Sequence, residues 1–168
     1  MITLDDFKVN AKEKGICDEY VAIWDRCISK KDIVDMGFSV KAVDYLCDAI
    51  AKGWGLSPQV ICEKFAPYIN GKYTLDNGLY TSQMYCRYGG DITCETTLLT
   101  LIECKVKVFV PETHSCYIYA CGECTIDISG GGEVIVVTYG KPSDVYVLGD
   151  KNVRCKRLHK EERDNYGD

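Results

Sequence analysis

This 168-residue chain lacks both a long hydrophobic run and an excess of basic residues. No apolar stretch approaches the roughly 18 residues that a membrane-spanning helix needs. Up to Asn70 there are nine Lys and Arg residues against eleven Asp and Glu, and beyond it eleven against fourteen, for a net charge of −5. Phosphate contacts need clustered cations, so neither part has the composition of a non-specific nucleic-acid binder. We therefore expect no membrane span, and the composition disfavours a nucleic-acid partner.

A secretory signal is also missing. The segment Met1–Asp6 has neither the basic residues nor the apolar core of a signal peptide. Hydrophobic residues make up 46% of the chain and charged residues 27%, which are ordinary values for a globular protein that can bury a core. The sequence therefore predicts a soluble, cytoplasmic protein.

Residues that carry catalysis are scarce. His114 and His159 are the only histidines. His114 lies two positions before Cys116, but a Cys–His nucleophile pair also needs a group that orients the base, and the sequence offers none. The Gly130–Gly132 run lacks the Lys-Ser/Thr pair and the helix of a phosphate-binding loop. We expect no enzymatic activity and no cofactor.

Cysteine, by contrast, is abundant, with eleven residues. An odd number in a chain without a secretion signal disfavours a disulfide framework, so thiols that act as small core residues are the favoured interpretation. Cys121 and Cys124 nevertheless have the spacing of two zinc ligands. A complete site would need further ligands from neighbouring strands, the candidates being Cys116, Cys104 and His114. The same motif is compatible with a thioredoxin-like redox pair, although the βαβ setting of that pair is absent.

The first part of the chain, residues 1–70, predicts five short helices. Ser29 and Ser39 occupy N-cap positions, and Gly37 ends the helix that Ser29 begins. Ser57 followed by proline is a strong start signal for the fifth helix. Short helices joined by short loops are typical of a compact helical bundle, which we expect here.

Residues 71–96 form a tyrosine-rich connector between this bundle and the rest of the chain. The Asn-Gly pair at 77–78 suits a tight hairpin turn and would pair Lys72–Leu75 with Leu79–Ser82. A helix over Thr81–Arg87 is the alternative.

Short β-type segments fill residues 97–158, with midpoints eight to eleven residues apart and turn-forming residues between them. They are Lys105–Val110, Cys116–Ala120, Glu123–Ile128, Glu133–Thr138, Asp144–Leu148 and Val153–Arg157. An antiparallel meander and a β-solenoid both fit, and the spacing favours a solenoid with roughly 18–19 residues in each coil. Residues 159–168 read as a charged tail. The predicted fold class is therefore α+β.

Tyrosines supply the candidate binding surface. Tyr117 and Tyr119 alternate with small or aliphatic residues, so they face outward if those residues face the interior. Tyr139 and Tyr146 lie in or beside later β segments. Outward aromatic residues on a stiff sheet suit protein binding, because tyrosine is enriched at interfaces. The alternative is that these tyrosines cover the sheet or pack against the helices.

A basic patch near the end of the chain consists of Arg154, Lys156, Arg157 and Lys160. Acidic residues follow it and dilute its charge. Ser29–Met36 and Ser39–Lys52 also have the outline of a helix-turn-helix. Asp44 and Asp48 on the second of these helices would repel phosphates, so ordinary helix packing is the favoured interpretation.

Two stretches of the sequence are familiar. The first is YLCDAIAKGWGLSP at Tyr45–Pro58, continued by Tyr68–Tyr73, and the second is YTSQMYC at Tyr80–Cys86. Together with the C-terminal β segments, they resemble small uncharacterised proteins of gut bacteria and of their mobile elements and phages. The resemblance implies an accessory intracellular protein that acts by binding, and it assigns no activity and no site residue.

These features predict a non-catalytic protein-interaction or assembly module. Its partner would be another protein or a second copy of the chain, bound through the β surface. Nucleic-acid binding through the helical half and the basic patch is the alternative function.

Overall fold

The computed structural model describes residues 4–13, 15–16, 18–39, 42–53, 57–75, 80–140, 144–147 and 154–160. Within these residues the helices are α1 (Leu4–Glu13), α2 (Asp18–Asp25), α3 (Lys30–Gly37), α4 (Val43–Ala51), α5 (Pro58–Phe65) and the short 3-10 helix η1 (Ala66–Tyr68). The strands are β1 (Gly71–Leu75), β2 (Tyr80–Cys86), β3 (Gly89–Thr93), β4 (Leu98–Ile102), β5 (Lys105–Val110), β6 (Ser115–Cys121), β7 (Thr125–Gly130), β8 (Glu133–Tyr139), β9 (Asp144–Val147) and β10 (Arg154–Lys160). The α+β class is confirmed. None of the described helices is long and apolar enough to cross a membrane.

Two of the helices begin with the capping residues that the sequence predicts. The Ser29 hydroxyl accepts a hydrogen bond of 3.1 Å from the Asp32 N–H, and the Asp32 carboxylate accepts one of 2.9 Å from the Ser29 N–H. This reciprocal capping box starts α3. At α5 the Ser57 hydroxyl accepts from the Val60 N–H at 3.2 Å, and Pro58 takes the first helical position.

Replacing Ser57 by alanine is expected to lower the free energy of unfolding by about 1 kcal/mol, because the Val60 N–H loses its partner. Urea unfolding followed by circular dichroism measures the change. Ser115 is an exposed serine on β6 and provides the control, because Ser115→Ala should change the free energy by less than about 0.5 kcal/mol. Equal effects of the two substitutions would contradict the capping role of Ser57.

The strands form two largely parallel sheets that wind together as a β-solenoid of about three turns. Sheet A has the order β1-β2-β4-β6-β8-β10 and sheet B the order β3-β5-β7-β9. From β2 onward the chain alternates between the sheets, and successive strands of each sheet pair in parallel. Residues paired in neighbouring coils are 16 positions apart at Gln83 and Leu99 and 21 apart at Glu133 and Arg154. The predicted solenoid is confirmed, and the antiparallel meander is wrong.

A hairpin closes one edge of sheet A. β1 pairs with β2 in an antiparallel manner, with Tyr73 opposite Ser82 and Thr74 opposite Thr81. The predicted pairing is therefore confirmed, while the residues of the turn lie outside the described ranges. Because β2 then runs parallel to β4, the alternative of a helix over Thr81–Arg87 is wrong. The tyrosine-rich connector thus supplies β1, β2 and β3, and its last two strands form the first coil.

Each passage from sheet A to sheet B has a residue with left-handed backbone at the same place. These residues are Arg87, Glu103, Gly122 and Gly140, with φ values of 52°, 49°, 70° and 68°. Neighbouring turns are joined by a hydrogen bond of 2.8 Å from the Arg87 N–H to the Ile102 carbonyl. A second of 3.0 Å runs from the Glu103 N–H to the Cys121 carbonyl. The chain therefore passes through the same corner in every coil.

The space between the sheets is filled by side chains that alternate along the strands. On β5, and on β7 with the residue before it, the buried side chains are those of Val106, Val108, Val110, Cys124, Ile126 and Ile128. Cys94, Cys104 and Cys116 belong to the same core. The interpretation of cysteines as small core residues is confirmed for these positions.

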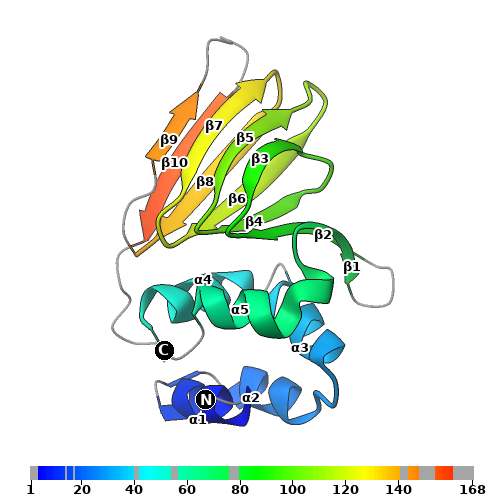
Figure 1. Cartoon of the computed structure of the whole chain (residues 1–168), viewed down its shortest axis with the longest axis vertical. Coiled ribbons are helices and arrows are strands. Elements are labelled where there is room, and N and C mark those ends of the chain that lie inside the picture. Colours follow the sequence, from blue (N-terminus) through cyan, green and yellow to red (C-terminus); the bar gives the residue numbers. More distant parts are fainter. Residues whose placement is uncertain are drawn as a thin grey trace.

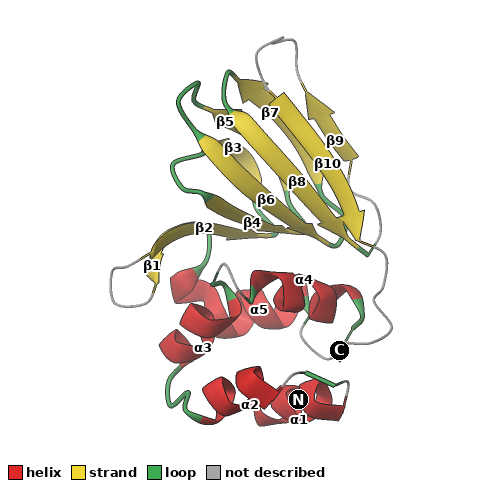
Figure 2. Ribbon diagram, turned by 180° about the vertical axis from the view of Figure 1, so that it is seen from behind, coloured by secondary structure: helices red, strands yellow, loops and turns green. Residues whose placement is uncertain are grey.

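A second apolar core lies between sheet A and the helices α3, α4 and α5. It contains Phe38, Val43, Ile61, Met84 and Ile102, among others. The helices thus share a core with the sheet, and a five-helix bundle is not confirmed. Figures 1 and 2 show the helices at one end of the two sheets, with α1 and α2 farthest from them. Sheet A is therefore covered on both faces where the helices contact it.

The Gly130–Gly132 run lies at the turn from β7 to β8. Gly130 has a φ of 107°, and a Cβ atom there would overlap the carbonyl oxygen of Val110. A Cβ atom at Gly132 would overlap the carbonyl oxygens of Pro111 and His114. The run therefore allows two neighbouring coils to approach closely.

Candidate interaction surface

The outer face of sheet B presents rows of side chains that run across its strands. The register aligns Asp91, Lys107, Asp127 and Tyr146 in one row. Adjacent rows contain Thr93, Phe109 and Ser129, and Gly89, Lys105 and Thr125. In Figure 1 the described helices lie at one end of the sheets, and none is drawn across β3, β5, β7 or β9. These rows define the sheet B surface.

Two aromatic residues stand on the sheet B surface. Phe109 on β5 is 49% exposed and Tyr146 on β9 is 51% exposed. Tyr146 is one of the tyrosines predicted for a binding surface. Phe109 is absent from that prediction, although the alternation that places Val108 and Val110 inward also places Phe109 outward. The alternation along β5 is therefore sufficient to predict that Phe109 faces outward.

The other predicted tyrosines do not join Tyr146 on one surface. Tyr117 is 49% exposed, but it lies on the outer face of sheet A. Tyr119 is half-buried on the same face and stacks on Tyr139, with 6.2 Å between the ring centroids. Tyr139 is 1% exposed because it packs in the core between sheet A and the helices. The prediction that Tyr139 lies on a binding surface is therefore wrong.

The sheet B surface carries charges of both signs. Lys105 and Lys107 lie on β5, while Asp91 and Asp127 lie on the two flanking strands. None of these four side chains forms an ion pair with another residue in the described part of the chain.

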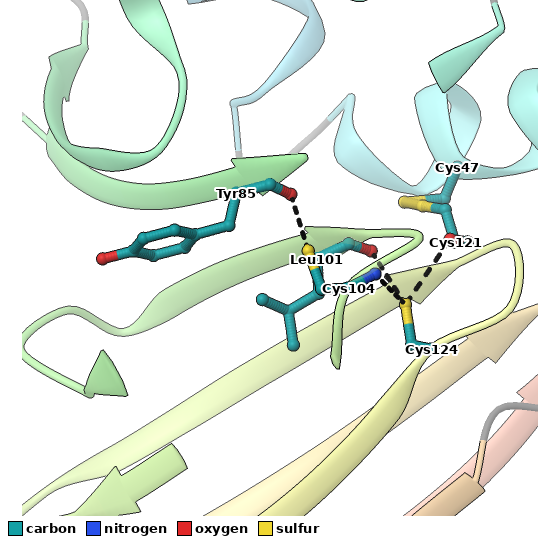
Figure 3. The surroundings of a disulfide bond; sticks show 6 residues. All are labelled: Cys47, Tyr85, Leu101, Cys104, Cys121 and Cys124. Carbon is teal, nitrogen blue, oxygen red and sulfur yellow. Dashed lines mark hydrogen bonds between the residues drawn. A yellow bond between two sulfur atoms is a disulfide. The ribbon is translucent and has the colours of Figure 1, made fainter. Parts of the chain in front are cut away.

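Cys121 forms a disulfide with Cys47 (Figure 3). Cys47 lies on α4 and Cys121 ends β6, 74 positions later, with 5.3 Å between their Cα atoms. Both residues are fully buried. The expectation against disulfides is wrong for this pair, because the packing of α4 on sheet A brings together two sulfurs that are far apart in the sequence.

Cys124 lies apart from this bond. Cys121 belongs to the core beside the helices, whereas Cys124 belongs to the core between the sheets. The Cys124 sulfur accepts a hydrogen bond of 3.4 Å from the Cys104 N–H, and its thiol donates to the Leu101 carbonyl at 3.7 Å. The two sulfurs of the motif therefore do not converge, and both the zinc and the redox interpretation of Cys121 and Cys124 are wrong. No group of three or more metal-ligating side chains occurs in the described ranges.

Cys116, the third metal candidate, is also buried in the core between the sheets. A hydrogen bond between Cys116 and Cys94 lowers the pKa of the Cys94 thiol. Burial raises the pKa of Cys104 to about 11, so that thiol stays protonated at neutral pH. The Nε2 atom of His114 is buried and has no hydrogen-bond partner among the described residues. No hydrogen bond therefore joins this nitrogen to Cys116 within the described residues.

The features that suggested nucleic-acid binding lie on β10 and α4. β10 pairs with β8 over Arg154–Lys160, and the side chains of the basic patch, including Lys156 and Arg157, lie outside the described residues. The second helix of the helix-turn-helix outline is α4. It packs on sheet A through buried residues such as Cys47 and Ile50. A helix held in this way presents its apolar face to the sheet and not to a DNA groove.

Comparisons with protein families, with curated proteins and with solved structures find no match to this chain. The resemblance to proteins of gut bacteria and their phages therefore stays a prediction. The fold itself defines the class: an α+β protein in which short helices cover one sheet of a two-sheet parallel β-solenoid.

Proposed function

We propose that this protein is a non-catalytic binding module that recognises a protein partner, or a second copy of itself, through the sheet B surface. One observation carries the proposal: Phe109 and Tyr146 are both about half exposed on a face that also carries lysines and aspartates, and these form no ion pair within the described part of the chain. Exposed aromatic residues within a polar rim are typical of protein interfaces.

The architecture supports the same proposal. Parallel pairing along sheet B fixes the spacing of the rows, so the surface is presented without a large ordering cost on binding. The interior behind it contains tightly packed aliphatic residues and cysteines, and it offers a partner a stiff platform. Association through this face would bury the two aromatic rings and surround them with charged groups.

The double variant Phe109→Ser/Tyr146→Ser is expected to weaken association by at least about tenfold, because buried aromatic anchors contribute more than about 1 kcal/mol each. Sedimentation velocity of the purified protein measures self-association. A pull-down from the native cytoplasm, followed by titration of the captured protein, measures binding to another chain.

Tyr117→Ser provides the matched control. Tyr117 is as exposed as Phe109 but lies on sheet A, so this variant should bind like the wild type. Loss of association in Tyr117→Ser alone would place the interface on sheet A and overturn the proposal. A wild-type protein that stays monomeric and captures no partner would also contradict it.

A further inference from the structure

A pair of cysteines lies at the contact between α5 and β2. Cys62 is on α5 and partly exposed, and Cys86 ends β2 and is buried. The two residues face each other across the same interface between the helices and sheet A that the Cys47–Cys121 disulfide crosses at α4 and β6. Cys62 and Cys86 are both free thiols in the described structure.

The hydrogen bonds of this pair place each thiol beside the backbone of the element that carries the other. The Cys62 thiol donates to the Cys86 carbonyl with 3.8 Å between sulfur and oxygen. The Cys86 thiol donates to the Pro58 carbonyl at 3.4 Å, and Pro58 lies one helical turn before Cys62 on α5. The Cys86 backbone is itself fixed, since its N–H donates to the Asn70 side chain at 3.0 Å. The Cys62 side chain is also close enough to contribute to the raised pKa of the Cys86 thiol.

We infer that Cys62 and Cys86 form a second disulfide between the helices and sheet A when the protein meets a small-molecule disulfide such as oxidised glutathione. The Cys62 thiolate attacks one glutathione sulfur, forms a mixed disulfide and releases one glutathione thiolate. The Cys86 thiolate then attacks the Cys62 sulfur and releases the second glutathione. Two cysteine sulfurs are oxidised, one molecule of oxidised glutathione is reduced to two thiols, and the two cysteine protons pass to solvent or to the glutathione thiolates.

The order of these steps follows from accessibility. Cys62 is the member of the pair that solvent reaches, so it meets the reagent first. Within the described residues two further pairs of cysteines are in contact. The side chains of Cys94 and Cys116 form one pair, and the Cys104 N–H donates to the Cys124 sulfur in the other, but all four residues are buried between the two sheets. An external disulfide does not reach them while the solenoid is folded. Among the described pairs of cysteines in contact, disulfide formation should therefore select the pair at the helix interface.

The second step should depend strongly on pH. Burial raises the pKa of Cys86 well above that of an ordinary thiol. Only the thiolate attacks a disulfide, so closure should accelerate roughly tenfold per pH unit between about pH 7 and pH 9.

The test incubates the full-length protein with oxidised glutathione and follows intact mass, thiol count and a non-reducing peptide map. The wild type should lose two hydrogen atoms and two titratable thiols, and the map should join the peptides of Cys62 and Cys86. Cys86→Ala should stop at one added glutathione on Cys62. Cys27→Ser, which removes another partly exposed thiol, should oxidise like the wild type.

Two results would overturn the inference. One is a wild-type map that joins Cys62 to a residue other than Cys86, and the other is glutathione that stays on Cys62 at high pH without closure. The map of the wild type decides the matter even if a cysteine variant fails to fold. Neither result bears on the sheet B surface, which is tested separately by association.

Discussion

The double variant C47A/C121A is expected to lower the free energy of unfolding by about 4 kcal/mol. The disulfide closes a loop with ends 74 positions apart, and in the chain-entropy model a cross-link of this span restricts the unfolded state by that amount. Urea unfolding of both proteins, with and without a reducing agent, measures the change. The wild type should lose stability in the reducing agent, whereas the double variant should be insensitive to it.

The Cys62→Ala background is the appropriate reference for this comparison, because it removes any contribution from the pair on α5 and β2. Cys27→Ala is the control for removal of a partly exposed thiol, and it should change the free energy by less than about 0.5 kcal/mol. A wild type that unfolds at the same urea concentration in both buffers would show that the Cys47–Cys121 bond does not contribute to stability.

Gly130→Ala is the second substitution with a large expected effect, a loss of about 4 kcal/mol. Two costs add: alanine is strained at a φ of 107°, and its Cβ atom overlaps the Val110 carbonyl of the preceding coil. The parallel pairing of β5 with β7 would have to shift to relieve the overlap. Thermal and urea unfolding should both report the loss.

Gly37→Ala is the matched control for this substitution. Gly37 ends α3, its φ lies outside the left-handed region, and an added Cβ atom would meet nothing within 4 Å. Alanine also favours the helix, so the expected change is neutral or a gain of up to about 1 kcal/mol. If both glycine variants lost stability equally, close packing at Gly130 would not be the cause.

A strand with one polar face is the kind that a sequence reveals most directly. β5 alternates exposed and buried residues along its whole length, so its period of two is visible in the chain. β4, by contrast, has the sequence LLTLI and is buried at every position. Its even-numbered residues Leu98 and Ile102 face the helices, and its odd-numbered residues Leu99 and Leu101 face sheet B. A strand between two cores loses the alternation by which a strand is recognised.

The candidate site was predictable to the extent that it depends on this alternation. Phe109 and Tyr146 face solvent because nothing in the described structure covers sheet B, and the period of two suffices to place them. Tyr139 has the same local pattern but is buried, because α4 covers its end of β8. The sequence likewise does not predict that Cys121 pairs with Cys47. Both outcomes depend on which helix packs on which sheet, and no spacing within one segment contains that information.

Because a left-handed residue recurs at the same corner, each coil is a repeat that could be duplicated or deleted as a whole. The chain from Arg87 to Glu103, or from Glu103 to Gly122, starts and ends in the same backbone conformation at the same side of the solenoid. After duplication or deletion of such a stretch, the following strand would start at the same corner and run in the same direction as before. The hairpin at one end and the helices beside sheet A would be unaffected by a coil gained or lost beyond β8. Evolution can therefore change the length of this platform in whole coils.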